Sequence, residues 1–278
     1  MSIPRTLALP DGVEAVTIDT ARGPFAAHNA AAVGEIRGHV LLIAGWTGSK
    51  EDFTPILPML AAAGFHATSY DQRGQFETPG KAGDDYSLDG FAADALAVRA
   101  ASGHGASHLL GHSFGGLVAQ TAAIAGNGVW QSLSLLCSGP GALSRTEEEA
   151  RPLTLLVGAI GHVPLADIHK YREQMAGFQR PPEVAAFLAT RFESNCPESL
   201  KAMTQLLIDA PDRLDEVAAL PLPKWVGRGK NDDAWPHDVQ AEMAKRLGVE
   251  IAIIRASAHS PAVENPEELS EALLKFWA

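Results

Sequence analysis

The chain has 278 residues, of which 46% are hydrophobic and 20% are charged, and this composition is typical of a globular protein. Its formal net charge of −11 disfavours nucleic acids and anionic membrane surfaces as partners, since both require a basic face. The two cysteines, Cys137 and Cys196, form no disulfide framework and no Cys/His metal spacing, which favours reduced thiols. Residues 1–10 lack a signal-peptide pattern, and no stretch approaches the roughly 18 apolar residues of a membrane span. We therefore expect a cytoplasmic protein.

The first half of the chain alternates between strand and helix patterns. Strands are predicted at 13–19, 24–29, 39–44, 66–70, 107–110 and 132–137, and helices at 51–63, 87–101 and 117–125. The continuous apolar run Val-Leu-Leu-Ile within 39–44 is typical of a buried parallel strand. Such alternation predicts an α/β fold with a mostly parallel central sheet and helices on both faces. Right-handed crossovers then place the reactive loops at the carboxyl ends of the strands.

The alternation stops between residues 139 and 222. This stretch has no convincing strand, and helices are predicted at 147–159, 165–176, 182–192 and 197–209. We interpret residues 139–222 as a helical cap inserted into a core formed by 1–138 and 223–278; alternatively, one or two of these helices belong to the layers of the sheet. The sheet pattern resumes with strands at 224–227 and 250–255 and helices at 238–247 and 266–277.

A Gly-x-Ser-x-Gly motif, Gly111-His112-Ser113-Phe114-Gly115, lies between a predicted strand and a predicted helix. This context is the one that a nucleophile elbow requires. The turn is so tight that a side chain at either glycine would collide with its neighbours. The motif predicts that Ser113 stands on a strained turn beside a helix N-terminus; the alternative is a glycine-rich turn with an incidental serine.

A serine hydroxyl needs a base, and the base needs an orienting group, to act as a nucleophile at neutral pH. Two later loops that follow predicted strands offer these groups: Asp232 after the strand at 224–227, and His259 after the last strand. Asp233 is an alternative acid, although the Gly-x-x-Asp spacing favours Asp232. His259 could instead be a surface histidine. We expect His112 to be a buried, hydrogen-bonded neighbour of the elbow rather than a second acid–base group.

These motifs, in the order Ser, Asp, His, resemble the α/β-hydrolase superfamily over nearly the whole chain. Residues 44–49 (Ala-Gly-Trp-Thr-Gly-Ser) look like its oxyanion loop, 71–74 (Asp-Gln-Arg-Gly) like its strand-four turn, and 111–115 like its elbow. The resemblance implies an α/β-hydrolase fold of the serine-nucleophile branch with a helical cap. It also implies that Ser113 is the nucleophile, His259 the general base and then acid, and Asp232 the orienting carboxylate.

The resemblance further implies an oxyanion hole made by the backbone N–H groups of Trp46 and Phe114. The chain departs from the family pattern at two positions. Ala44 stands where a histidine often precedes the first glycine of the oxyanion loop, so the bonding around that loop must differ. Phe76 stands where a second glycine is common.

Apolar side chains near these loops are candidates for a substrate pocket. The predicted pocket residues are Phe76, Met175, Phe178, Phe192 and Trp235. Amphipathic helices carry such residues for their own packing as well, so the prediction concerns the group rather than any one member.

We therefore expect a serine hydrolase that cleaves a small to medium, partly apolar carboxylic ester, with water as the second substrate and no metal or organic cofactor. The same triad could instead cleave a carbon–carbon bond, lactone, thioester or amide, or act through His259 alone as a base. A non-catalytic small-molecule receptor on the same scaffold is a further alternative, although a binder has no need of a base and its acid.

Overall fold

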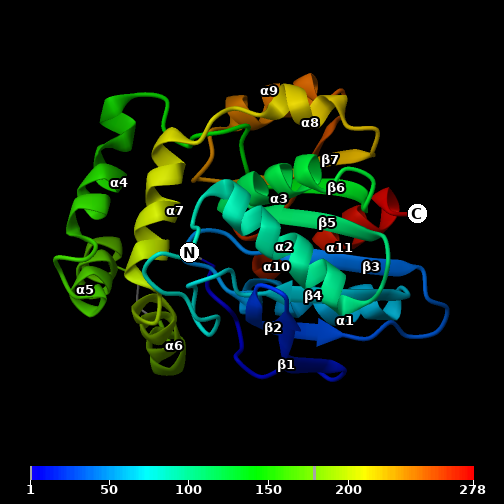
Figure 1. Ribbon diagram of the computed structural model, residues 1–278, viewed down its shortest axis with the longest axis horizontal. Helices are drawn as coiled ribbons and strands as arrows, with labels where there is room; N and C mark the ends of the chain where they lie inside the picture. The colour runs from blue at the N-terminus through cyan, green and yellow to red at the C-terminus, as the bar shows by residue number, and fades with distance from the viewer. Residues whose placement is uncertain (1, 178–179) are drawn as a thin grey trace.

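The computed structural model describes residues 2–177 and 180–278, and it is organised around one eight-stranded sheet (Figure 1). The strands are β1 (Val13–Thr20), β2 (Gly23–Ala30), β3 (Gly38–Ile43), β4 (Phe65–Tyr70), β5 (Ser107–His112), β6 (Trp130–Leu136), β7 (Lys224–Gly229) and β8 (Ile251–Ile254). Their order in the sheet is β1-β2-β4-β3-β5-β6-β7-β8. The pairs β1–β2 and β2–β4 are antiparallel, and all other neighbouring strands run parallel. This confirms the predicted mostly parallel sheet.

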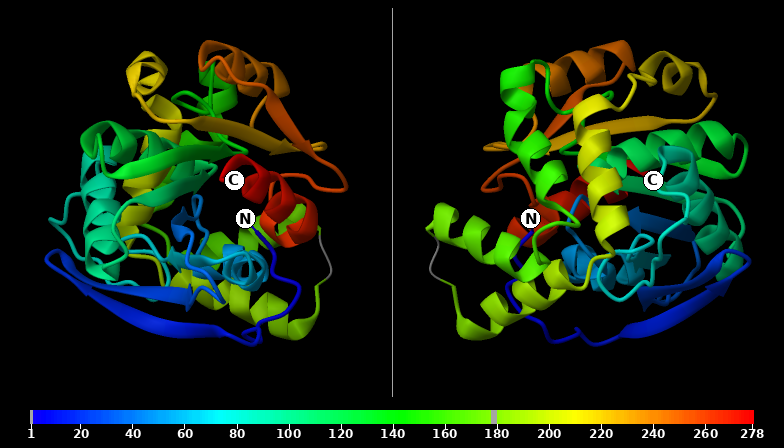
Figure 2. Two further views of the ribbon diagram at one scale, coloured as in Figure 1. Left: turned by 90° about the vertical axis from the view of Figure 1, so that its right-hand side faces the viewer. Right: turned by 60° about the vertical axis from the view of Figure 1, so that its left-hand side comes forward.

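Helices cover both faces of the sheet (Figure 1, Figure 2). One face carries α2 (Leu88–Ser102), α3 (Phe114–Ala125), α8 (Leu214–Ala219) and α9 (His237–Arg246). The other carries the 3-10 helix η1 (Lys50–Ile56), α1 (Leu57–Ala62), α10 (Pro261–Glu264) and α11 (Pro266–Phe276). A single helix was expected over 51–63; the chain instead forms η1 and then α1. Pro55, which has no N–H to donate, lies where η1 ends.

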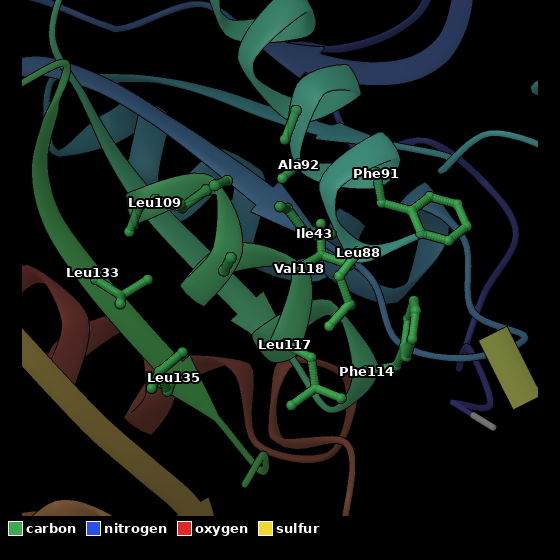
Figure 3. Packing of buried hydrophobic residues seen from close by; sticks show 14 of the residues in the cluster. Ile43, Leu88, Phe91, Ala92, Leu109, Phe114, Leu117, Val118, Leu133 and Leu135 are labelled. Atoms are coloured by element: carbon green, nitrogen blue, oxygen red, sulfur yellow. The ribbon is translucent and has the colours of Figure 1, made fainter. Parts of the chain in front are cut away.

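The strands divide their side chains between two cores. Leu41 and Ile43 of β3 pack into the cluster under α2 and α3, whereas Val40 and Leu42 pack into the cluster on the opposite face. Successive side chains of a strand point to opposite faces, so a continuous apolar run is buried on both sides. Figure 3 shows the first cluster, where Leu109, Leu133 and Leu135 of the sheet meet Leu117 and Val118 of α3.

Four helices gather beyond one end of the sheet (Figure 1): α4 (Glu147–Ala159), α5 (Leu165–Ala176), α6 (Pro182–Glu193) and α7 (Pro197–Asp209). α4 packs against α7, and α5 packs against α6. Among the described residues of 139–222 there is no strand, only an isolated bridge between Ile160 and Val163. α8 lies in the same stretch but packs against α3 and α9, so its Leu214 and Val217 belong to the main core.

Within the described residues, every helix is too short or too polar to cross a membrane.

Two buried histidines, His39 and His108, lie near the amino ends of β3 and β5, whereas the elbow follows the carboxyl end of β5. The His39 ring is fully buried, with Nδ1 2.9 Å from Ser107 Oγ and Nε2 3.0 Å from Thr68 Oγ1. His108 Nδ1 lies 2.8 Å from Ser132 Oγ on β6, and its ring stacks on Trp277. Burial lowers the pKa of His39 to about 3 and that of His108 to about 4. Both side chains are therefore neutral in the folded protein at neutral pH.

These histidines predict a loss of stability in acid. Between pH 6.5 and about 4 the unfolded chain binds protons that the folded protein excludes, so the free energy of unfolding rises with pH and falls as the solution is acidified. Each histidine adds a slope approaching about 1.4 kcal/mol per pH unit inside this window. Urea unfolding between pH 7 and pH 4.5 measures the slope.

The variant His108→Asn isolates one contribution, because an amide can still hydrogen-bond Ser132 but does not titrate. Its unfolding free energy should depend less steeply on pH than that of the wild type over the same window. Equal slopes for the two proteins would contradict this account of His108.

Candidate active site

The turn between β5 and α3 holds Ser113 in a backbone conformation that residues other than glycine rarely adopt. Ser113 has φ 56° and ψ −122°, while its N–H donates to Leu136 O (2.9 Å) on the neighbouring strand. A Cβ at Gly111 would lie 2.2 Å from the carbonyl oxygen of Gly115, and one at Gly115 would lie 2.3 Å from Ile43 O. Real Cβ atoms do not approach backbone so closely, and the two glycines are therefore required by the packing of this turn.

Ser113 is the first member of a hydrogen-bonded chain of three side chains. Its Oγ lies 3.0 Å from His259 Nε2, and His259 Nδ1 lies 2.8 Å from Asp232 Oδ1. Because a carboxylate only accepts, His259 carries its proton on Nδ1, which leaves Nε2 free to accept from the serine hydroxyl. The three residues, widely separated in sequence, meet because β5, β7 and β8 run parallel and end at the same edge of the sheet.

Asp232 is enclosed, and its two carboxylate oxygens have defined partners. Oδ1 also accepts from Ala234 N (3.1 Å), and Oδ2 accepts from Gln240 Nε2 (3.0 Å). Burial by itself would raise the pKa of Asp232, but the hydrogen bonds from His259, Ala234 and Gln240 outweigh it, and the net pKa lies below the usual value. The neighbouring Asp233 is exposed to solvent, and only Asp232 reaches His259.

His112 is buried beside the catalytic candidates and bonded to them. Its Nε2–H donates to the carbonyl oxygen of His259 (2.6 Å), and the two rings lie 4.8 Å apart. Burial, followed by the proximity of His259, lowers the pKa of His112 to about 3, so it is a neutral donor that fixes the backbone of the His259 loop. This agrees with the expectation of a hydrogen-bonded neighbour.

The backbone N–H groups of Trp46 and Phe114 are oriented by the carbonyls of their own peptide groups. Gln75 Nε2 donates to Gly45 O (3.1 Å), and Ser138 Oγ donates to Ser113 O (2.8 Å). In a trans peptide the N–H points opposite to the carbonyl, so tying each carbonyl back turns the following N–H the other way. Phe114 is also the first residue of α3, where an N–H has no acceptor within the helix.

Two glutamines that were not predicted from the sequence support the loop of residues 44–49, which resembles the oxyanion loop of the family. Gln72 Nε2 donates to Ala44 O (2.9 Å), and Gln75 holds the next carbonyl, Gly45 O. They provide the loop bonding that the absence of a histidine at Ala44 left unassigned. Only their position beside the turn at Gly74 could have indicated them, because glutamine at such a turn has no characteristic spacing.

A cavity of about 160 Å³ opens beside Ser113. Its polar lining consists of Ser2, Asp52, His112 and His259, and the backbone of Gly45 and Trp46 borders it too. Its apolar wall consists of Leu143, Leu153 of α4, Leu207 of α7, Ala234 and Trp235. The Trp235 indole N–H lies 3.5 Å from Ser113 Oγ, and its ring leaves no space for a side chain at Gly139. The cavity is thus partly apolar and directly borders the serine.

Of the five predicted pocket residues, the structure places only Trp235 in this cavity. Phe76 packs edge-on against Phe187 (5.6 Å between centroids) with the Lys50 amine over its ring. Phe192 is fully buried in a small cluster with Ile160, Ile168 and Leu200. Met175 is 71% exposed on α5. Phe178 lies outside the described residues. The leucines of α4 and α7 take the expected place, since helical periodicity does not tell a pocket-facing side chain from a core-facing one.

Cys137, His112 and His259 bring their ligand-type atoms within 4.8 Å of one another. The two ring nitrogens of His259 are hydrogen-bonded to Ser113 and Asp232. Burial raises the pKa of the Cys137 thiol well above its usual value, which keeps it protonated, and the His112 Nε2–H is bound to a carbonyl. Cys137 and His112 therefore pack around His259.

Comparison with known proteins identifies the family of this chain. A sequence model of the Alpha/beta hydrolase family matches residues 40–272. A protein of Variovorax paradoxus named "Putative carbamate hydrolase RutD" is 28% identical over 249 residues, which are 86% of this chain and 91% of that protein.

Solved structures with the same fold include two esterases. One is a thermophilic esterase from Thermogutta terrifontis, with a TM-score of 0.76 and 22% identity over 95% of this chain and 97% of its own. The other is an esterase from Exiguobacterium antarcticum, with a TM-score of 0.78 and 16% identity over 95% of this chain and 99% of its own. At these identities they show a shared fold. The family match over most of the chain confirms the resemblance seen in the motifs, and the protein belongs to the alpha/beta hydrolase family.

Proposed function

We propose that this protein is a serine hydrolase that cleaves a small to medium, partly apolar carboxylic ester through an acyl-enzyme. The observation that carries the proposal is the continuous hydrogen-bonded chain from Ser113 Oγ through His259 to Asp232, with distances of 3.0 and 2.8 Å. Nucleophile, base and orienting acid within such distances, next to a cavity, form the arrangement used for acyl transfer. The α/β-hydrolase family membership supports hydrolysis as the reaction class.

The proposed reaction has two halves. Ser113 Oγ attacks the carbonyl carbon while its proton moves to His259 Nε2; the leaving alkoxide then takes that proton and departs as the alcohol. In the second half a water molecule gives a proton to His259 and attacks the acyl group. Collapse of this intermediate releases the acid and returns the proton to Ser113. The amides of Trp46 and Phe114 bind the oxyanion, and losing one such donor typically raises the barrier by about 3 kcal/mol.

A second candidate bond is a carbamate, because that is the substrate class in the name of the Variovorax relative. The same three groups would form a carbamoyl-enzyme on Ser113 in place of an acyl-enzyme. A panel of matched esters, carbamates, thioesters and lactones, read by product analysis, distinguishes these reactions. As part of the proposal, the enzyme acts on a small molecule in the cytoplasm, with water as co-substrate and no cofactor.

Covalent labelling tests whether Ser113 is an activated nucleophile. A fluorophosphonate should modify Ser113 stoichiometrically in the wild type, because His259 activates the hydroxyl. Labelling should be absent in Ser113→Ala and at least about 100-fold slower in His259→Ala, the range that a general base contributes. Peptide mass spectrometry locates the adduct, and circular dichroism verifies that each variant is folded.

The two adjacent aspartates give a matched control for this experiment. Asp233→Asn removes an exposed charge and should label like the wild type, whereas Asp232→Asn removes the acceptor for His259 Nδ1–H and should label slowly. A folded wild type that stays unlabelled would overturn the acyl-enzyme mechanism.

Gln240 donates to Asp232 Oδ2 (3.0 Å) and to Trp235 O (3.0 Å). In Gln240→Leu the carboxylate loses one of its donors, so the pKa of Asp232 should rise and His259 should be held less firmly. A hydrogen bond to a charged group contributes about 1.5–3 kcal/mol, so kcat on an aryl ester should fall by about tenfold or more.

The control for Gln240 is Gln174→Leu, the same substitution at an exposed position on α5. It should leave kcat unchanged. If the Gln240 variant keeps wild-type kcat and unfolding free energy, the orienting role of Gln240 is wrong.

A further inference from the structure

Arg172 on α5 is a half-buried cation with no anionic partner in the described part of the chain. Its guanidinium lies over the Trp46 ring, 4.8 Å from the centroid, and 5.2 Å from the centroid of Phe192. Its Nη1 is inaccessible to solvent and has no hydrogen-bond acceptor among the described residues, and no described carboxylate oxygen lies within 4.0 Å of the guanidinium. A guanidinium nitrogen that is shielded from solvent and has no acceptor is uncommon, because the hydration it loses is not replaced.

Two fully buried cations of the same protein, Arg191 and Lys50, are paired with carboxylates. Arg191 Nη1 lies 2.8 Å from Asp52 Oδ1, and Lys50 Nζ lies 3.1 Å from Asp71 Oδ2. Arg172 differs from both, and burial alone lowers the pKa of its guanidinium. Contact with the faces of two aromatic rings stabilises the charge but leaves the in-plane N–H groups without acceptors. The guanidinium thus retains unused donors beside the residue whose N–H is proposed for the oxyanion hole.

His169 supplies a second unused polar atom at the same place. It precedes Arg172 by three residues, so both side chains lie on one face of α5. The ring is buried against Phe192 (5.5 Å between centroids), and its Nδ1 has no partner among the described residues. A neutral imidazole can donate a hydrogen bond from this nitrogen. His169 and Arg172 thus lie side by side, and each has a nitrogen that is shielded from solvent and has no partner among the described residues.

Both residues line a cavity of about 360 Å³ that also borders His259. Three carboxylates line it too, and each is accounted for. Glu173 pairs with Arg180, Glu264 Oε2 accepts from the N–H groups of Ala258 and Ser260, and Asp233 is exposed to solvent. None of them lies within salt-bridge distance of Arg172. A ligand carboxylate that enters this cavity therefore meets a cation that is not paired with any described carboxylate.

We propose that Arg172, assisted by His169, binds a carboxylate carried by the leaving group of the substrate. This inference rests on the proposed ester hydrolysis. The leaving oxygen takes its proton from His259, so a group attached to that oxygen extends past His259, where this cavity lies. A planar guanidinium matches a carboxylate in geometry as well as charge. The net charge of −11 repels anions at long range, and selection of an acidic substrate must therefore be local.

The test compares two esters that differ only in the charge at the far end of the leaving group, 4-acetoxybenzoate and the neutral 4-acetoxybenzamide. The wild type should have a kcat/KM at least about tenfold higher for the carboxylate, as expected for a charge-assisted contact. In Arg172→Gln this ratio should fall to about one, through loss of activity on the anionic ester. A purely structural role for Arg172 would lower both activities together and leave the ratio unchanged.

Lys170→Gln is the matched control, because it removes an exposed positive charge from the same helix. It should preserve the ratio. Equal loss of the ratio in the Lys170 and Arg172 variants would show that overall charge, and not the cavity, makes the selection, and it would overturn the proposal. So would a wild type that cleaves both esters with equal kcat/KM.

A binding measurement separates failure of this inference from failure of the proposed function. Calorimetry with Ser113→Ala and the leaving-group product 4-hydroxybenzoate should show binding at least about tenfold tighter than for 4-hydroxybenzamide, and adding Arg172→Gln should remove the difference. That result would support the subsite even if neither ester were cleaved. Equal affinity for the acid and the amide would overturn it even if both esters were cleaved.

Discussion

The backbone of Ser113 is the constraint on which the rest of the site depends. For a residue other than glycine, a backbone conformation with φ 56° costs about 1–3 kcal/mol of free energy. It persists only where the neighbouring structure enforces it. Here Ser113 N–H is tied to Leu136 O on β6, and Ser113 O accepts from both Gly116 N and Ser138 Oγ. The turn therefore belongs to the sheet as much as to its own loop, and the hydroxyl is held outside the sheet at the start of α3.

The remaining groups reach the hydroxyl because of strand direction. Parallel strands end at a common edge, so the loops that carry Asp232 and His259 come together although they are far from Ser113 in sequence. The bond from His112 to the carbonyl oxygen of His259 and the bond from Gln240 to Asp232 then fix those loops. A local feature at β5 and a global feature of the sheet are thus both needed for the three side chains to form one chain of hydrogen bonds.

The helices beyond the sheet edge contribute walls to the cavities beside this hydrogen-bonded chain of side chains. Leu153 and Leu207 make the wall beside the serine apolar, while α5 places Arg172 against Trp46 of the oxyanion-like loop. Under the proposal, the apolar wall of one cavity and Arg172 in the other, both of which border His259, favour a substrate with one apolar and one acidic part. The proposed specificity thus depends on α4, α5 and α7, and the proposed chemistry on β5, β7 and β8.

The sequence by itself determined the sheet, the elbow and the candidate residues Ser113, Asp232 and His259. These features have local causes: alternation of apolar runs, glycines that a tight turn requires, and polar residues directly after strands. Tertiary structure alone decided which apolar side chains line the cavity, because Phe76, Met175 and Leu153 all carry the same helical or loop signal and differ only in what lies opposite them. It also decided the roles of Gln72, Gln75 and Gln240 and the isolation of Arg172, since a hydrogen-bond partner, or the lack of one, depends on contacts between segments that no spacing along the chain encodes.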